Sequence, residues 1–248
     1  MSASTSTSTP WSPRSNKARF DAKAPQAPAT VTPITAHDPA SADELPIAGI
    51  MPFSATDWPG KLTVTVFTQG CPLACVYCHN AQLQEFRAGS EKFSEALALL
   101  RERKGLYDGL VISGGEPTAS PHLPAAIAAA HAEGLAVGLH TCGYQPRRIT
   151  ALLRSPETTP DWVGFDAKAL PEHFPAVTGG TLRMAGGNWE SLRLLSEAGV
   201  DMQVRTTLWP GSVIERHLDE LRERVADLGH ELVVQYARGV DREGRYAS

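Results

Sequence analysis

The fold of this chain is decided by a stretch that joins a strand to a cysteine-rich loop, Leu62-Thr-Val-Thr-Val-Phe-Thr-Gln-Gly-Cys71-Pro-Leu-Ala-Cys75-Val-Tyr-Cys78-His79-Asn80. Residues 62–68 are rich in β-branched side chains, which favours a buried strand. The loop that follows carries three cysteines. In parallel α/β folds, side chains just past the strands gather at one edge of the sheet. The stretch therefore predicts a first strand and a site at its end.

Downstream of this loop, helical and strand segments alternate. The predicted helices are residues 93–103, 123–133, 147–154, 189–198 and 213–228. The further predicted strands are residues 110–113, 136–140, 162–165, 202–206 and 232–235. Such alternation implies right-handed βαβ crossovers and a parallel sheet. Because six units are two short of an eightfold barrel, we predict the α/β class with a partial (β/α)6 barrel; a doubly wound sheet is the alternative.

The composition of the chain changes near residue 44. Residues 1–44 are rich in Ser, Thr, Ala and Pro, so they cannot bury enough apolar surface to offset the entropy lost on ordering. We therefore expect a disordered tail at 1–44, one folded domain at 45–240 and a C-terminal tail at 241–248. Of the 248 residues, 42% are hydrophobic, which is enough for one core.

Charge and hydropathy exclude two classes of partner. The formal net charge is −4, whereas nucleic-acid-binding proteins present a basic face. No apolar run reaches the roughly 18 to 20 residues that span a bilayer, and the N-terminus lacks the apolar segment of a secretory signal. We expect a cytoplasmic protein that binds neither nucleic acid nor membrane. The alternative is an organelle transit peptide, because Arg14, Lys17 and Arg19 precede the first acidic residue.

The clustered cysteines predict a metal centre. Cys71, Cys75 and Cys78 lie within eight residues, and the fourth cysteine, Cys142, lies far along the chain. Such clustering in an intracellular chain favours metal binding over disulfides. Three thiolates leave one iron of a four-iron cluster without a protein ligand, so a substrate can bind there. The alternative is a zinc ion bound by three cysteines and His79, or by all four cysteines.

Polar and glycine residues follow most of the predicted strands. The candidates after the later strands are Gly114, Gly115, Glu116, Thr141, Asp166, Lys168, Arg205, Thr206 and Gln235. Glycines let a ligand approach the backbone, a carboxylate accepts hydrogen bonds from an ammonium, and a guanidinium can hold a carboxylate. The alternatives are an ordinary strand-to-helix turn and structural ion pairs.

The cysteine motif resembles the signature of the radical S-adenosylmethionine (SAM) superfamily, Cys-x3-Cys-x2-Cys with an aromatic residue, here Tyr77, before the last cysteine. The following His79-Asn80 resembles the superfamily's branch of glycyl-radical-enzyme activases. Residues 48–60 (Ala-Gly-Ile-Met-Pro-Phe-Ser-Ala-Thr-Asp-Trp-Pro-Gly) are similar to anaerobic ribonucleoside-triphosphate reductase activating proteins. The resemblance runs from about residue 47 to 239 and implies a partial barrel of the radical SAM type.

This resemblance implies a [4Fe-4S] cluster on Cys71, Cys75 and Cys78, with SAM bound to the open iron. One electron would cleave SAM to a 5′-deoxyadenosyl radical, which abstracts a hydrogen atom from the substrate. No catalytic residue is implied beyond the cluster ligands. The implied cofactor-binding residues are Tyr77, Gly114, Gly115, Glu116, Thr141, Asp166, Lys168 and Arg205.

Particular roles follow from the same resemblance. The segment 114–117 would bind the SAM amino group, and Lys168 would bind its carboxylate with Asp166 close by. Arg205 would hold the carboxylate or the ribose, and Tyr77 would pack on the adenine. Structural roles for Arg205 and Tyr77, in a salt bridge and in covering the cluster, are the alternatives.

Four further features bear on the comparison with the family pattern. Asp57 is expected to face a protein substrate, and residues 178–180 are similar to a short family segment. Related activases often carry an acidic residue at the position of His140, and Asn or a small residue at Cys142. His140 therefore argues against a cation site beside the cofactor, and Cys142 is expected to be a buried thiol.

The function that the resemblance implies is that of a radical SAM oxidoreductase, which makes a glycyl radical on an anaerobic ribonucleotide reductase. Pyruvate formate-lyase or another glycyl radical enzyme is the alternative partner. A low-potential donor such as flavodoxin or ferredoxin would supply the electron. Two other classes stay open: radical chemistry on a small molecule, as in 7-carboxy-7-deazaguanine synthase, and a zinc-stabilised interaction module.

Overall fold

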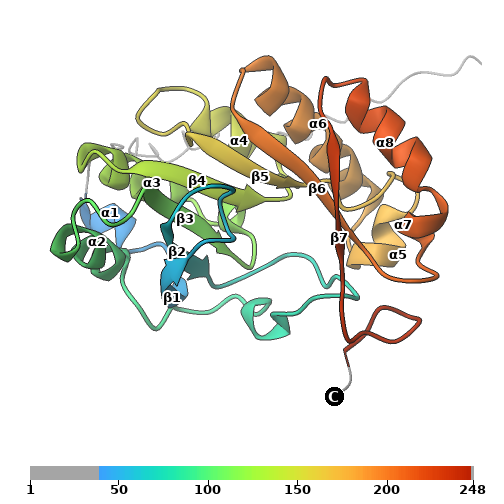
Figure 1. Cartoon of the computed structure of the whole chain (residues 1–248), viewed down its shortest axis with the longest axis horizontal. Coiled ribbons are helices and arrows are strands. Elements are labelled where there is room, and N and C mark those ends of the chain that lie inside the picture. Colours follow the sequence, from blue (N-terminus) through green and yellow to red (C-terminus); the bar gives the residue numbers. More distant parts are fainter. Residues whose placement is uncertain (1–38, 247–248) are drawn as a thin grey trace, which may run out of the picture. The chain divides into compact units, whose positions relative to one another are not determined.

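The computed structural model describes residues 39–246, whose strands form one seven-stranded sheet in sequential order. The six predicted parallel strands are β2 (Thr63–Thr68), β3 (Gly109–Gly114), β4 (Ala136–Thr141), β5 (Trp162–Asp166), β6 (Met202–Leu208) and β7 (Leu232–Tyr236). This order confirms the α/β class (Figure 1). It differs from a doubly wound sheet, in which the strand order reverses at a switch point.

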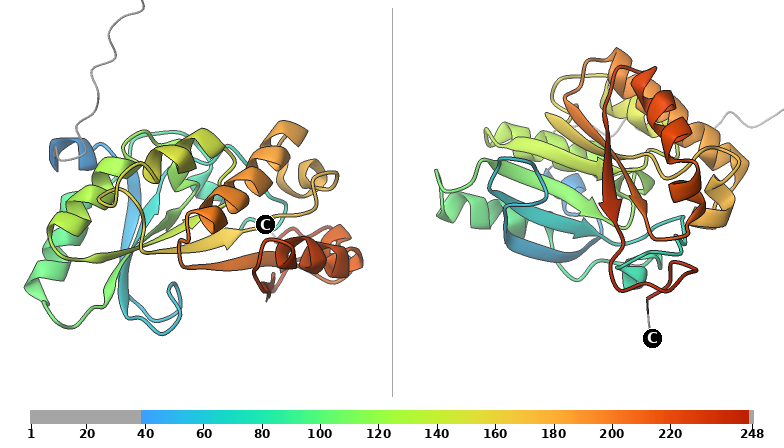
Figure 2. Two further views of the ribbon diagram at one scale, coloured as in Figure 1. Left: turned by 90° about the horizontal axis from the view of Figure 1, so that it is seen from above. Right: turned by 45° about the vertical axis from the view of Figure 1, so that its right-hand side comes forward.

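Helices connect the strands and cover one face of the sheet (Figure 2). They are α1 (Pro39–Ala42), α2 (Phe93–Glu102), α3 (Leu123–Ala132), α4 (Pro146–Leu152), α5 (Phe174–Thr178), α6 (Leu182–Glu197), α7 (Val213–Arg216) and α8 (Leu218–Ala226). The short 3-10 helices are η1 (Ala81–Leu83) and η2 (Pro117–Ala119). Alternate strand residues such as Val64, Leu110 and Val137 are fully buried and join the helix residues in one core. The other face of the sheet is therefore free to carry polar side chains.

The sequence pattern does not predict one strand. β1 (Ile47–Ser54) runs antiparallel to β2 at the edge of the sheet. Gly49 and Pro52 interrupt any alternation of apolar residues, and the register shifts between Met51 and Ser54. Proline is tolerated in an edge strand because one side of that strand needs no ladder partner. The Pro52 carbonyl accepts a hydrogen bond from the Tyr107 hydroxyl at 2.6 Å.

The loop between β1 and β2 closes the sheet's polar face near the starts of the strands. Trp58 from this loop is 7% exposed and stacks on Trp162 of β5, with ring centroids 5.5 Å apart. Val111 of β3 completes the cluster. A Cβ at Gly138 of β4 would lie 2.9 Å from the Trp58 ring, so this glycine makes room for the indole. An apolar layer thus lies beneath the strand ends that carry the candidate site.

Several helix boundaries differ from the prediction. α6 begins seven residues before its predicted start, because Thr181 caps it by accepting a hydrogen bond from the Met184 amide at 3.3 Å. The predicted helix 213–228 is divided at His217 into α7 and α8. The sequence pattern did not predict α5.

The ends of the described range also differ from the expected tails. α1 lies within the predicted disordered tail, and Ala42 and Leu45 are buried because they pack into the main core. Residues 1–38 lie outside the described residues. Residues 241–246 form a turn, closed by a bridge between Val240 and Tyr246. Within residues 39–246, no helix combines the length and apolar character that crossing a membrane requires.

Candidate functional site

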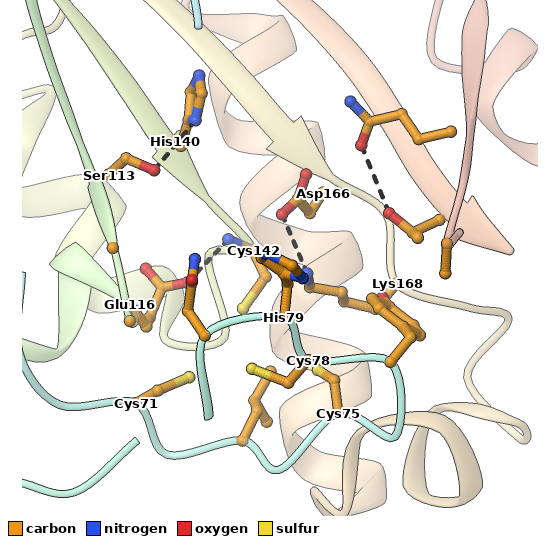
Figure 3. Close-up of a pocket in the computed structure, with 18 of the residues that line it drawn as sticks. Cys71, Cys75, Cys78, His79, Ser113, Glu116, His140, Cys142, Asp166 and Lys168 are labelled. Carbon is orange, nitrogen blue, oxygen red and sulfur yellow. Dashed lines mark hydrogen bonds and ion pairs between the residues drawn. The ribbon is translucent and has the colours of Figure 1, made fainter. Parts of the chain in front are cut away.

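A pocket of about 500 Å³ opens at the C-terminal ends of the parallel strands (Figure 3). Ten of the eleven predicted cluster and cofactor residues line it: Cys71, Cys75, Tyr77, Cys78, Gly114, Gly115, Glu116, Thr141, Asp166 and Lys168. The eleventh, Arg205, does not line the pocket but binds Asp166 from below. Gln235 lines the pocket as well, whereas Thr206 is buried and its neighbour Thr207 takes its place in the lining.

Backbone hydrogen bonds hold the cysteine loop in place. The amides of Ala74 and Val76 donate to the carbonyls of Thr178 and Val177, at 2.8 and 3.0 Å. The segment 178–180 therefore supports the loop from its outer side. Figure 3 shows the three cysteines on this loop, with Glu116, Asp166 and Lys168 facing them across the pocket.

The thiols of Cys71 and Cys75 lie in surroundings that disfavour a bare thiolate. Burial raises the pKa of the Cys71 thiol to about 12, with a further contribution from Glu116, and burial also raises the pKa of Cys75. A metal centre supplies the positive charge that thiolates need here. Within residues 39–246, no three His, Cys, Asp or Glu side chains are already drawn together around one metal ion, and this holds for Cys71, Cys75 and Cys78 as well as for sets that include His79 or Cys142.

The two glycines at the end of β3, Gly114 and Gly115, allow close contact with neighbouring backbone. Gly114 has a φ of +120°, and a Cβ there would lie 2.1 Å from the Thr68 nitrogen. A Cβ at Gly115 would lie 2.3 Å from the Gly70 oxygen. This close approach lets the amides of Gly115 and Glu116 donate to the carbonyls of Thr68 and Gly70, both at 2.9 Å. The glycines thus join this turn to the start of the cysteine loop.

The carboxylate of Glu116, a residue that is only 3% exposed, accepts hydrogen bonds from several protein donors. Its Oε1 accepts from the hydroxyls of Thr118 and Thr141, both at 2.5 Å, and from the Thr118 amide at 3.1 Å. Its Oε2 accepts from the Cys142 amide at 2.8 Å. Glu116 therefore ties the turn after β3 to the end of β4, and a ligand ammonium would share an oxygen that is already engaged.

Asp166, Lys168 and Arg205 form an ion-paired row across the strand ends. Asp166 Oδ2 accepts from Lys168 Nζ at 3.0 Å, and Oδ1 accepts from Arg205 Nε at 2.8 Å. Strand register places the latter pair, because Asp166 and Arg205 are partners on β5 and β6. Although burial pushes the pKa of Asp166 upward, the two cations outweigh it and hold the pKa well below its usual range. Lys168 keeps two of its three N–H donors for other partners.

Below this row, His140 is a neutral imidazole. Its Nε2 donates to the Asp57 carbonyl at 2.6 Å, and its Nδ1 accepts from the Ser113 hydroxyl at 3.2 Å. Burial, followed by the charge of Arg205, lowers the pKa of His140 to about 4. The carboxylate of Asp57, which lies in the loop between β1 and β2, accepts a hydrogen bond from the Thr65 hydroxyl at 2.6 Å. The Asp57 carbonyl thus contacts a residue that lines the pocket, and the expectation that Asp57 faces a protein substrate stays a prediction.

Tyr77 has a packing role that the structure makes explicit. Its ring is 7% exposed and lies 5.7 Å from the Trp209 ring, with Lys168 Nζ also 5.7 Å from its centroid. This contact packs the cysteine loop on the residue that follows β6. The contact of Tyr77 with an adenine stays a prediction. Cys142 is a free thiol, 2% exposed, as expected.

The C-terminal residues form a wall of the pocket that sequence reasoning missed. Tyr236, Ala237 and Tyr246 line the pocket, and the Tyr246 ring contacts His79 edge-on, with centroids 5.1 Å apart. The Trp209 indole anchors this segment by donating to the Arg242 carbonyl at 2.9 Å. No motif or period marks these residues, which lie at and beyond the end of the last predicted strand.

The sequence profile described as "Radical SAM superfamily" matches residues 65–225, from the middle of β2 to the last turn of α8. The chain belongs to the radical SAM superfamily. Its cofactors are a [4Fe-4S] cluster and SAM. The matched range contains all eleven of the predicted cluster and cofactor residues.

Relatives and solved structures agree with this membership. A Methanocaldococcus jannaschii protein named as a glycyl-radical enzyme activating enzyme is 28% identical over 73% of this chain and 75% of its own. The pyruvate formate-lyase-activating enzyme of Clostridium pasteurianum is 30% identical over 66% of this chain and 68% of its own. The crystal structure of QueE from Escherichia coli shares the fold, with a TM-score of 0.51, 16% identity, and coverage of 77% of this chain and 84% of that chain.

The donor set of this radical SAM protein fits its cofactors. Burial favours the neutral form of Cys71 and Cys75, and each of the three thiols would release its proton to solvent on binding an iron atom. Lys168 offers unused donors in the same pocket, and an ammonium is a suitable partner for a carboxylate. Because Asp166 fixes Lys168 on one side, the remaining donors are oriented before a ligand arrives.

Proposed function

We propose that this protein is a glycyl-radical-enzyme activase, an oxidoreductase whose partner is an anaerobic ribonucleoside-triphosphate reductase. The observation that carries the proposal is the single pocket shared by Cys71, Cys75, Cys78 and Lys168. The names of the relatives support the activase class, and the similarity of residues 48–60 supports the reductase as partner. Pyruvate formate-lyase, named by the second relative, is the alternative partner. A low-potential flavodoxin or ferredoxin and a cytoplasmic location complete the proposal.

In this proposal the residues of the chain bind and orient the cofactors. Cys71, Cys75 and Cys78 hold the cluster and leave one iron for SAM. When bound, the cluster and SAM supply a 5′-deoxyadenosyl radical after a one-electron reduction. Lys168, fixed by Asp166, binds the SAM carboxylate. The remaining contacts and supports of the cofactor are assigned to Tyr77, Gly114, Gly115, Glu116, Thr141 and Arg205.

The arrangement also suits a protein substrate. The lining of the pocket includes Tyr236 at the end of β7, whose side chain is 63% exposed. An inserted backbone loop could contact such aromatic side chains without needing a set of buried polar groups. A small heterocycle would instead need convergent polar groups of its own, and both carboxylates of the pocket already have protein partners.

The test is anaerobic reconstitution with iron and sulfide, followed by dithionite and SAM. Chromatography would measure 5′-deoxyadenosine, and electron paramagnetic resonance would measure a glycyl radical on added reductase or pyruvate formate-lyase. Cys75→Ala should abolish cleavage because it removes a cluster ligand. Lys168→Ala should keep the iron content but weaken SAM binding. Cleavage of SAM with no radical on either partner would refute the activase assignment, and full activity of Cys75→Ala would refute the cluster assignment.

A further inference from the structure

A second surface groove lies beside the cofactor pocket, between the starts of α4 and α6. It is lined by Tyr144, Gln145, Pro146, Arg147, Arg183, Met184, Gly186, Gly187 and Glu190, none of which lines the cofactor pocket. α4 and α6 run side by side here (Figure 1). Gly187 allows their close approach, since a Cβ there would lie 2.3 Å from the Tyr144 carbonyl oxygen.

The groove carries an excess of positive charge. Arg147 and Arg183 are exposed, and within residues 39–246 neither forms an ion pair. Arg148, next on α4, is half-buried and its Nε has no hydrogen-bond partner. The acidic residue of the groove, Glu190, is held by two hydrogen bonds from Arg193, at 2.9 and 2.6 Å. Arg147 donates one hydrogen bond, to the uncharged Gln145 Oε1 at 3.2 Å. The positive charges of Arg147 and Arg183 can therefore attract an acidic partner.

Only one packed layer separates this groove from the cluster ligands. Leu73, Cys142, Phe174 and Ala185 form a small buried cluster of apolar residues. Tyr144 and Met184 of the groove pack against this cluster, and so do Cys71 and Cys75. A redox partner seated in the groove would thus approach the iron–sulfur cluster without entering the cofactor pocket, which stays open for SAM and substrate.

We propose that this arginine-rich groove is the docking surface for an acidic, low-potential electron-transfer protein. The inference rests on the proposed radical SAM function, which requires one electron per cleavage. In the step itself the donor loses one electron and the oxidised cluster gains it; no bond or proton is exchanged. The charge of the groove selects an acidic donor, and the thin layer behind it gives that donor a short path to the cluster.

The experiment compares two charge-reversal variants of the reconstituted holoenzyme. Arg147→Glu/Arg183→Glu alters the groove, and Lys61→Glu/Lys104→Glu makes the same charge change at exposed residues near the starts of the strands. Stopped-flow absorbance would follow cluster bleaching by fully reduced acidic flavodoxin, and by dithionite. We expect the groove variant to lose about tenfold in the flavodoxin rate at low ionic strength, with its dithionite rate unchanged. The control variant should keep both rates within about twofold of wild type.

The possible results separate this proposal from its alternatives. Equal flavodoxin rates for the two variants would overturn it. A fall in both the flavodoxin and the dithionite rates would show damage to the cluster and would also overturn the docking proposal. Normal cluster reduction with impaired radical formation on the partner enzyme would overturn it as well. Arg147→Gln/Arg183→Gln provides a milder version if charge reversal lowers the iron content. Because reduction is measured without SAM, failure of the proposed activase function leaves this test intact.

Discussion

Asp166→Asn is the substitution that tests most directly how the strand-end ion pairs support the site. Asp166 accepts from Lys168 Nζ at 3.0 Å and from Arg205 Nε at 2.8 Å. The side chains of these cations are only 16% and 10% exposed, so neither is well hydrated. Asparagine has nearly the same size but no charge. The substitution therefore leaves two cations facing each other and a neutral His140.

The expected loss of stability follows from the burial of these groups. Removing one partner of a buried ion pair costs about 3 to 5 kcal/mol. Asp166 keeps 27% of its side chain exposed, so water replaces part of the lost interaction and we take the lower end, about 3 kcal/mol. For a domain of this size, each kcal/mol shifts the Tm by roughly 2 to 4 °C. The Tm should therefore fall by about 6 to 12 °C.

The fall in Tm would be measured by thermal unfolding monitored with circular dichroism, on reconstituted protein without SAM and at matched iron content. The control is Asp219→Asn, which removes an exposed carboxylate, 93% accessible, from an ion pair with Arg222 at 3.2 Å. Such a pair contributes at most about 1 kcal/mol. A shift at Asp166 no larger than the shift at Asp219 would contradict the assignment of a strong buried network.

The pH dependence gives a second check on the same residue. The pKa of Asp166 is held below its usual range, so its contribution is complete above the unfolded pKa near 4 and is lost only as pH falls further. The stability difference between wild type and Asp166→Asn should hence stay constant from about pH 5 to 8. A difference that disappears within that window would show that another group carries the effect.

Two further predictions concern the same layer. The pKa of His140 is lowered to about 4, so unfolding is accompanied by proton uptake below about pH 6.5. The free energy of unfolding should therefore fall by up to about 3 kcal/mol between pH 6.5 and 4. Urea titrations of His140→Gln should show a flatter dependence on pH. Gly164→Ala should cost about 1 to 3 kcal/mol, because its Cβ would lie 2.8 Å from the His140 ring and 2.9 Å from Arg205 Nη1. The control is Gly186→Ala, because a Cβ at Gly186 would meet no atom within 4 Å, and this substitution should be neutral or stabilising. Equal changes in stability for the two substitutions would contradict the predicted clash at Gly164.

The part of the site that could be predicted from sequence depends on residue type and strand periodicity. Three closely spaced cysteines have few uses other than metal binding, and short apolar segments that alternate with helices mark the strands whose ends carry Glu116, Asp166 and Lys168. Because parallel strands end at one edge, these residues could be placed together without knowing any contact. Side-chain direction could not be predicted in this way: Arg205 binds Asp166 and does not line the pocket, and Thr207 rather than Thr206 lines it. The role of Arg205 toward the cofactor stays a prediction.

Other features were beyond sequence reasoning because long-range packing decides them. β1 has no periodic pattern and is a strand because β2 offers it a free edge. Tyr246 lines the pocket only because a distant indole, that of Trp209, binds the turn that carries it. The stacking of Trp58 on Trp162 likewise joins residues about a hundred positions apart, with no motif linking them. Such contacts appear only once the sheet has closed around them.

The layers beneath the pocket explain which groups remain for a ligand. The apolar layer around Trp58 closes the lower end, and the His140 layer above it uses its hydrogen-bonding groups internally. Glu116 accepts four hydrogen bonds from protein donors, and Asp166 is shared between two cations. Both pocket carboxylates are thus committed, and the three thiols and the spare donors of Lys168 remain. A cationic metal cluster and a ligand carboxylate match those groups, and the preorganised polar layers contribute to the cofactor site by holding those groups in place.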